Sequence, residues 1–392
     1  MKESVTTMEN HVINAERLAD TFMELVRIDS MSREEGEVAR MLAAKLTGLG
    51  ARVEMDQAGG QVGGQTGNLL AFLPGNRSAD PLLLAAHMDT VGPGRGVEPR
   101  LDDGVFSSAG ETILGADDKS ALAIILEVLT CIREQDLPCG PLEIVFTICE
   151  EVGLLGAKHL AYDKLSARMG YALDTRSTDE IITKAPCANR LTFTLFGKAA
   201  HAGSSPEKGI NAISLASKAI AQLNLGRIDA ETTCNIGMIQ GGLATNIVPE
   251  QVVVQGEVRS HSRDKLDKVT QTIVSAFKRT IDTYNDRQDD LPRLEMDVQL
   301  DFECLDVNPQ HPVVGLVRQA AANLGRAMET AASGGGSDAN IFAGKGIAAA
   351  VLGTGMDKVH TVNECIKLED MVQTGLLVLE ILRLHTERKS SI

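Results

Sequence analysis

The chain has 392 residues, of which 43% are hydrophobic and 23% are charged, as in an ordinary soluble globular protein. This length favours two domains. The net charge of −15, from 38 basic and 53 acidic residues, argues against nucleic acid as the main partner. No run approaches the roughly 18 apolar residues of a membrane span, and the N-terminal segment MKESVTTMENHVINAERL has no apolar signal core. We therefore expect a cytoplasmic protein with no membrane partner.

Seven cysteines are scattered through the sequence without a CxxC spacing. They stand at positions 131, 139, 149, 187, 234, 304 and 365. Their odd number and irregular spacing predict reduced, mostly buried thiols, and they argue against a structural cysteine-type zinc site.

The predicted elements begin with two amphipathic helices, and two strands around a glycine-rich turn come next. Their ranges are 14–26 and 34–49 for the helices, and 51–56 and 68–73 for the strands. A buried strand at 82–86 follows, and His87 and Asp89 lie at its carboxyl end. Residues i and i+2 of an extended chain share one face, so His87 can act as a metal ligand that Asp89 orients.

Two acids, Asp117 and Asp118, precede a strongly apolar helix predicted at 120–134. Acids at this position can cap the helix and complement its dipole. The alternative is that one of them belongs to a functional site.

The next predicted strand, 142–148, ends on two adjacent carboxylates, Glu150 and Glu151. Neighbouring residues that leave a strand point in different directions, so one of the pair can hold a metal while the other moves a proton. A solvated acidic turn is the alternative. A further apolar strand then ends on Asp174.

A second imidazole, His360, follows an apolar strand predicted at 347–353. Strands that alternate with helices form a mostly parallel sheet, and its carboxyl edge gathers the residues at the strand ends. The gathered set is His87, Asp117 or Asp118, Glu150 or Glu151, Asp174 and His360. Two imidazoles and three carboxylates suit zinc or a similar divalent ion. One carboxylate more than a single ion needs indicates two ions that share it.

The sequence pattern changes near residue 185. Predicted strands at 190–196, 232–240, 251–260 and 293–302 alternate with helices at 206–223 and 262–284. This β-α-β-β-α-β order is the ferredoxin-like arrangement. The first pattern then resumes, with helices at 312–324 and 368–385. We therefore predict an α/β fold, in which 1–184 and 304–392 form a mostly parallel-sheet domain and 185–303 is an inserted α+β domain.

Nine motifs follow one another along the chain in the order of a known family. They are LLLAAHMDTV, LGADDKS, FTICEEVG, ALDT, GKAAHAGSSPEKGINAI, NIVPE, GEVRS, GGSDAN and VHTVNE. The chain resembles the co-catalytic zinc metallopeptidases that include peptidase T, carboxypeptidase G, bacterial dipeptidases and aminoacylase, and it is most similar to peptidase T-like proteins. The resemblance extends over essentially the whole chain. It implies a di-zinc catalytic domain, and an inserted lid domain through which the protein forms a homodimer.

The resemblance also implies which residues bind the metals. His87 and Asp174 would be ligands of one ion, and Glu151 and His360 would be ligands of the other. The acid that bridges the two ions would be Asp117 and not Asp118, because the bridging acid of the family stands two residues before the position of Lys119. A cis peptide bond usually follows that acid.

The remaining roles implied by the resemblance are catalytic and substrate-binding. Glu150 would be the general base that deprotonates a metal-activated water, and Asp89 would orient His87. His201 would stabilise the oxyanion, in dimeric members from the partner subunit, and Arg259 would bind a substrate carboxylate. Asn246 is a further candidate for a polar substrate contact. For His201 a locally packed loop histidine is the alternative, and for Arg259 an exposed strand arginine.

The implied activity is zinc-dependent hydrolysis of amide bonds in short peptides, by an aminopeptidase or tripeptidase of the peptidase T type. A dipeptidase or an N-acyl-amino-acid deacylase with the same two-metal chemistry is the alternative. A non-catalytic binding protein on the same fold is a third interpretation, but every ligand position and Glu150 are present in this sequence.

Overall fold

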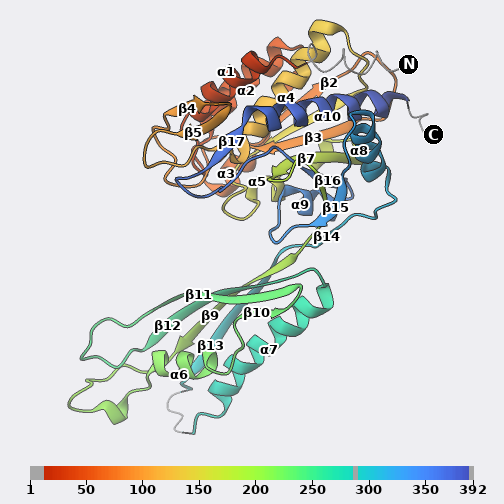
Figure 1. Ribbon diagram of the computed structural model, residues 1–392. Coiled ribbons are helices and arrows are strands. Elements are labelled where there is room, and N and C mark those ends of the chain that lie inside the picture. The colour runs from red at the N-terminus through yellow and green to blue at the C-terminus, as the bar shows by residue number, and fades with distance from the viewer. Residues whose placement is uncertain (1–12, 286–289, 388–392) are drawn as a thin grey trace. The chain divides into compact units, whose positions relative to one another are not determined.

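The computed structural model describes residues 13–285 and 290–387 (Figure 1). The chain divides into two compact units. The first comprises the chain up to Thr183, Asp306–Ser333 and the chain from Ser337, and the second comprises Lys184–Leu305 with Gly334–Gly336. The predicted insertion, 185–303, lies within the second unit. Most of the N-terminal segment that lacks a signal core, residues 1–12, lies outside the described residues.

The first unit is built on a nine-stranded sheet with the order β1-β2-β6-β3-β7-β16-β8-β14, in which β15 also pairs with β8. The strands are β1 (Arg52–Met55), β2 (Leu69–Leu73), β3 (Leu82–His87), β6 (Leu142–Thr147), β7 (Met169–Thr175), β8 (Glu180–Ala185), β14 (Leu305–Asp306), β15 (Glu329–Ala332) and β16 (Ala348–Gly353). The central strands β6, β3, β7 and β16 pair in parallel, while β2 and β8 join this centre antiparallel. The predicted α/β fold class is confirmed, with a mixed sheet that is parallel at its centre.

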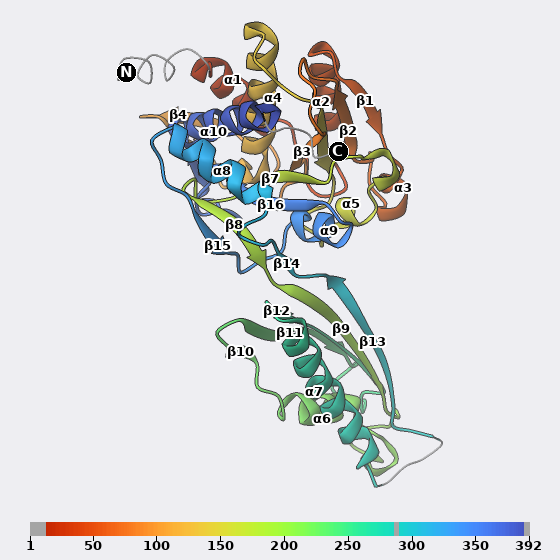
Figure 2. The same ribbon diagram turned by 90° about the vertical axis from the view of Figure 1, so that its right-hand side faces the viewer.

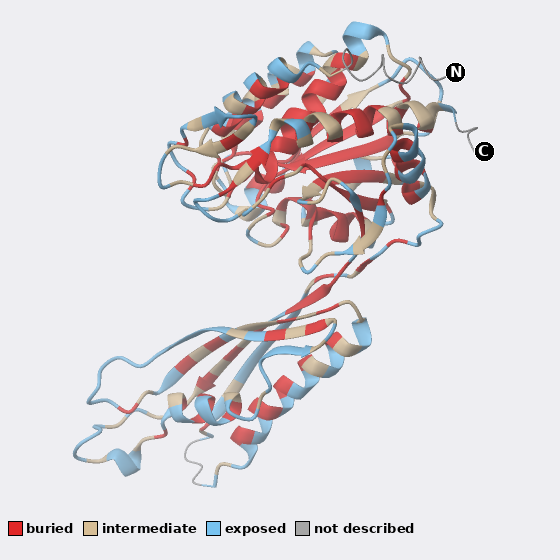
Figure 3. Cartoon of the chain, viewed as in Figure 1, coloured by how far each residue is buried: buried red, intermediate tan, exposed pale blue. Residues whose placement is uncertain are grey.

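Helices cover both faces of this sheet, which explains why β3 and β6 are buried along their whole length (Figures 1 and 3). In Figure 2, α4 and α10 lie above the central strands, and α5 and α9 lie below them. The helices are α1 (Ala15–Val26), α2 (Gly36–Gly48), α3 (Ala58–Val62), α4 (Ala116–Gln135), α5 (Leu155–Lys158), α8 (Pro312–Asn323), α9 (Asp338–Gly344) and α10 (Leu368–Glu387). The predicted glycine-rich turn contains α3, which the sequence did not reveal.

A small three-stranded sheet was not predicted, because its strands are short. It has the order β17-β5-β4, formed by β17 (Cys365–Lys367), β5 (Val105–Ser108) and β4 (Pro99–Asp102). The pair Ile366 and Phe106, both buried, lies at the centre of the β17–β5 ladder. This ladder brings the segment that follows His360 close to the segment that precedes α4.

The second unit has a five-stranded sheet with the order β10-β11-β12-β9-β13 and two helices. The elements are β9 (Cys187–Phe196), α6 (Ala212–Ile220), β10 (Gly226–Asp229), β11 (Thr232–Gly241), β12 (Gln251–Ser260), α7 (Arg263–Asp282) and β13 (Arg293–Phe302). Apart from the short β10, this is the ferredoxin-like order, with every pair antiparallel. Its core includes the stacked rings of Phe193 on β9 and Phe277 on α7, whose centroids are 4.0 Å apart.

The prediction that all seven cysteines are free thiols is wrong for one pair, because Cys187 and Cys304 form a disulfide. They are 117 residues apart in the sequence. The pairing of β13 with β9, which aligns Phe302 with Ala188, brings the two cysteines together. Such a long-range alignment is not visible in the spacing of cysteines. The other five cysteines form no disulfide within the described residues, and four of them are buried.

Within residues 13–285 and 290–387, no helix has the length and apolar character needed to cross a membrane.

Candidate metal centre

Three parallel strands deliver candidate ligands to one edge of the central sheet. His87 is the last residue of β3, and its neighbour in the ladder with β6 is Thr147, three residues before Glu150. On the other side, β3 and β7 are paired up to Ala85 and Ala172, so that Asp174 lies two residues beyond the last pair, level with His87. The predicted gathering at the carboxyl edge of the sheet is therefore present for these strands.

Asp117, at the start of α4, lies beside His87 at this same edge of the sheet. The preceding Gly115 has a left-handed conformation, with φ of +80°, and the peptide bond between Asp117 and Asp118 is cis, as the resemblance implied. The two acids have different partners. Asp117 contacts imidazole side chains, whereas Asp118 Oδ2 accepts a hydrogen bond from the backbone N–H of His87 at 3.2 Å. Between the two acids, Asp117 is thus the one placed among the candidate ligands.

The carboxylate of Asp117 lies between two histidines from distant parts of the chain. Its Oδ1 is 3.0 Å from Nε2 of His87, and its Oδ2 is 3.2 Å from Nε2 of His360. His360 Nε2 also lies 3.0 Å from Oε1 of Glu151. His87 is buried, whereas the side chain of His360 is 49% exposed. One wall of the centre is therefore open to solvent.

These donors fit a divalent ion. One ligand atom from each of His87, Asp117 and Glu151 lies within 4.8 Å of the other two, which is the separation expected of atoms that share an ion. Imidazole nitrogen and carboxylate oxygen are the donors that zinc and related ions accept.

The pKa shifts of the buried acids also favour a bound cation at this place. Burial raises the pKa of Asp174 and of Glu150 well above the usual range, and neighbouring carboxylates add to it, Asp117 in the first case and Asp174 in the second. Burial also raises the pKa of Glu151 despite its contact with His360. If all these crowded carboxyl groups were ionised, their negative charge would exceed what two imidazoles offset, and a bound cation would supply the missing positive charge.

Asp89 contacts both His87 and the turn that carries the two glutamates. Its carboxylate accepts hydrogen bonds from the backbone N–H groups of Glu150 at 2.9 Å and Glu151 at 3.2 Å, and from the hydroxyl of Ser32 at 2.6 Å. The Nδ1 atom of His87 lies 2.9 Å from the backbone oxygen of Asp89 and 3.5 Å from its carboxylate. Asp89 therefore contacts His87 mainly through its backbone, while its side chain fixes the turn that carries both glutamates.

The three predicted substrate-binding residues lie in the second unit. His201 and Asn246 are exposed and belong to neighbouring segments, since the N–H of Ala202 donates to the oxygen of Asn246 at 2.9 Å. His201 Nδ1 accepts from the backbone N–H groups of Gly203 and Ser204. Arg259 is near the end of β12, where one guanidinium nitrogen contacts Glu257 at 3.0 Å and the buried Nε has no hydrogen-bond partner in the described chain.

Sequence reasoning assigned no role to two buried acids near the centre. Glu364 accepts hydrogen bonds from the backbone of the segment that carries Asp117, and Asp338 accepts one from Thr147 at the end of β6. Burial raises the pKa of Asp338 to about 6. Both lie in the quoted motifs, GGSDAN and VHTVNE, and membership of these motifs was the signal available in the sequence.

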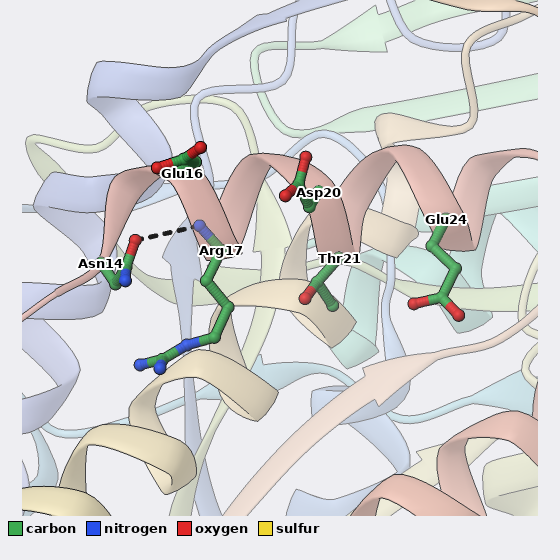
Figure 4. Close-up of a pocket in the computed structure, with 6 residues that line it drawn as sticks. All are labelled: Asn14, Glu16, Arg17, Asp20, Thr21 and Glu24. Atoms are coloured by element: carbon green, nitrogen blue, oxygen red, sulfur yellow. Dashed lines mark hydrogen bonds between the residues drawn. The ribbon is translucent and has the colours of Figure 1, made fainter.

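A shallow depression of about 260 Å³ lies elsewhere, along the outer side of α1 (Figure 4). Its lining residues are Asn14, Glu16, Arg17, Asp20, Thr21 and Glu24, and none is a candidate ligand. Arg17 is already engaged by Glu127 and Glu134. The depression is a feature of the helix surface and has no connection to the metal centre.

The pKa of His360 leads to a prediction for the metal-free protein. Hydrogen bonds to Asp117 and Glu151 raise this pKa from 6.5 to about 10. A pKa raised in the folded state stabilises that state fully below pH 6.5, and the stabilisation is lost as the pH rises towards about 10. We expect the free energy of unfolding in EDTA to fall over this window, and to fall less in His360→Gln. Solvent screening of this half-exposed side chain keeps the difference small.

Urea denaturation at several pH values measures this dependence, with His159→Gln as the control because it removes another exposed histidine of the same unit. Equal pH dependence in wild type and His360→Gln would contradict the prediction.

Comparison with known proteins now identifies the family. The model of the family described as "Peptidase family M20/M25/M40" matches residues 83–383. The Bacillus subtilis protein YqjE is 40% identical over 372 residues, covering 95% of this chain and 99% of its own. Two solved structures are similar over 96% of this chain and their full length: aminopeptidase PepT from Bacillus cereus (39% identity, TM-score 0.85) and a tripeptidase from Staphylococcus aureus (37%, 0.89). The chain belongs to the peptidase family M20/M25/M40 and is a hydrolase of the metallopeptidase class.

Proposed function

We propose that this protein is a two-metal aminopeptidase that removes the first residue of short peptides, with tripeptides as its substrates and zinc as its metal. The observation that carries the proposal is the placement of the Asp117 carboxylate between two histidines, beside Glu151. The similarity to an aminopeptidase and a tripeptidase over the whole chain supports the choice of substrate.

The geometry supports a definite division of ligands. Asp117 directs one oxygen to His87 and the other to His360, as a carboxylate that bridges two ions would. His87 and Asp174, from neighbouring strands, form one pair of ligands, and Glu151 and His360 form the other. Two imidazoles with carboxylates favour zinc over magnesium or calcium, which prefer oxygen ligands alone.

Ions at such a site supply Lewis-acid chemistry, because they lower the pKa of a water molecule and polarise a carbonyl group. Glu150 is the residue placed to move the proton. Its backbone is held by Asp89, its carboxylate is buried, and the raised pKa of that carboxylate suits a group that takes a proton and then releases it. Glu150 accepts the proton of the attacking water and delivers it to the leaving nitrogen.

The positions of the substrate-binding candidates in the second unit favour a homodimer. His201 and Asn246 flank the end of β12 that begins at Gln251, whereas Arg259 is near its other end. Arg259 lies eight positions after Gln251 along the extended strand, a distance of about 26 Å. A short peptide cannot contact both groups of residues in one subunit. We infer that Arg259 binds the substrate carboxylate, and that His201 and Asn246 reach the same substrate from the partner subunit.

A panel of peptides tests the substrate class. We expect metal-reconstituted protein to hydrolyse tripeptides with a free amino terminus, and to lose that activity when the amino group is acetylated. The panel includes dipeptides and N-acyl amino acids, and each rate is compared with that of Glu150→Ala prepared in parallel, to subtract contaminating peptidases. Hydrolysis that survives acetylation would refute an aminopeptidase and favour the deacylase alternative.

Glu150 and Glu151 should respond differently to substitution. Glu150→Gln removes the proton acceptor but no metal ligand, so kcat should fall by about 10²–10⁴-fold while metal content stays at two ions per chain. Glu151→Gln is the matched control, and it should lose metal as well as activity. Both quantities are measured by elemental analysis and steady-state kinetics. Metal loss in Glu150→Gln with retention in Glu151→Gln would reverse the two assignments.

The shared site can be tested by subunit mixing. Glu150→Ala and His201→Ala subunits are each expected to be inactive as homodimers. In a heterodimer, one site combines an intact Glu150 with an intact His201 from the partner, so random mixing should restore about a quarter of the wild-type activity. Analytical ultracentrifugation verifies that dimers have formed. Mixed dimers without activity would show that His201 does not act across the interface.

A further inference from the structure

Glu364 is a buried carboxylate bonded entirely to backbone groups from a distant part of the chain. Its side chain is 1% exposed. One oxygen accepts the N–H of Leu114 at 2.8 Å and of Gly115 at 2.7 Å, and the other accepts the N–H of Asp117 at 3.0 Å. About 250 residues separate these donors from Glu364.

The donors lie where the backbone most needs an acceptor. Buried backbone N–H groups need an acceptor, and these three lie outside regular helix, because Leu114 and Gly115 precede α4 and Asp117 has non-helical dihedral angles beside the cis peptide bond. Gly115 is left-handed and has no side chain that could accept, so the acceptor for this stretch of backbone comes from Glu364. The same three hydrogen bonds define where the backbone of Asp117 lies.

Glu364 is equally firmly attached to the loop of His360. Its backbone N–H donates to the oxygen of Thr361, the residue next to His360, at 3.1 Å. Asp357 and Cys365 exchange two backbone hydrogen bonds, which close the loop directly after Glu364. Glu364 therefore connects the half-exposed His360 to the backbone of Asp117 by a short series of hydrogen bonds.

We propose that Glu364 is a positioning residue that sets the separation between His360 and the Asp117 carboxylate, and so determines the affinity of the ion bound by Glu151, His360 and Asp117. The inference rests on the two-metal site of the proposed function. Asp117 would be a ligand of both ions, but the other ion would also be held by His87 and Asp174 on β3 and β7, whose positions do not rest on the hydrogen bonds of Glu364, so its affinity depends less on Glu364. Groups that orient metal ligands without touching the metal typically change metal affinity 10–100-fold when they are removed.

The substitution Glu364→Gln tests the hydrogen-bonding role of this side chain, because it keeps the size of the side chain and removes part of its capacity to accept hydrogen bonds. A glutamine keeps the shape, and its oxygen can accept from Leu114 and Gly115 or from Asp117, but its NH₂ group cannot accept from the remaining donors. Glu143→Gln is the matched control in the same unit. Glu143 is also a buried acid, 4% exposed, and its two oxygens accept the backbone N–H groups of Ser166 and Ala167.

The experiment titrates the metal-free full-length protein with Co²⁺ and follows the visible absorption of the bound ion together with calorimetry. Wild type and Glu143→Gln should both bind two equivalents, with the same spectra. Glu364→Gln should bind one equivalent with an affinity close to that of wild type, and bind the second at least tenfold more weakly than wild type does, with an altered spectrum. Circular dichroism of the metal-free variants verifies that each is folded, and Glu364→Asp serves as a second variant that keeps the charge but cannot span the same distance.

The outcomes separate the two proposals. A wild-type protein that does not bind two equivalents refutes the two-metal site and this inference with it. Two equivalents in wild type, with unchanged affinities and spectra in both Glu364 variants, refute only the positioning role. A Glu364→Gln protein that loses no more metal affinity than Glu143→Gln also refutes only the positioning role, because a general loss of stability then explains the effect.

Discussion

The metal centre depends on one carboxylate that two imidazoles share. Asp117 is held between His87, at the end of a central strand, and His360, in a loop far along the chain. In the metal-free state, protonated histidines stabilise this arrangement, and burial makes an uncompensated Asp117 carboxylate costly. The two elements that carry His87 and His360 must therefore meet within hydrogen-bonding distance of the Asp117 side chain. The parallel centre of the sheet and the small sheet β17-β5-β4 both serve that requirement.

Around this centre, three buried acids accept hydrogen bonds from backbone N–H groups. Asp89 binds the N–H groups of Glu150 and Glu151, and Glu364 binds those at the start of α4. Glu35 does the same one residue earlier in the Glu150 turn, where it accepts the N–H of Cys149 at 3.0 Å. Turns that end strands leave such N–H groups without a ladder partner, and a carboxylate satisfies them more strongly than a neutral acceptor would.

Much of this could be predicted from the sequence, because the elements that carry ligands are strongly patterned. The uninterrupted apolar run of β6, and the acids that follow it, placed Glu150 and Glu151 correctly at a strand end, and the order of strands and helices predicted a parallel centre. The position of Glu364 was not predictable, because its partners lie about 250 residues away and are backbone groups without a sequence signature. The same is true of β4, β5 and β17, which are too short for alternation to appear. The disulfide escaped prediction because it depends on the alignment of β9 with β13.

That alignment also bears on how proteins with this fold diverge. The long segment of the second unit, Lys184–Leu305, begins just before β9 and ends just after β13, and the disulfide between Cys187 and Cys304 joins the adjacent ends of these two strands. An excursion that departs and returns at one point can lengthen, shorten or change its surface without shifting the strands on either side of it. Selection for a new substrate can therefore remodel the residues from β9 to β13, while the candidate ligands at the edge of the central sheet stay in register.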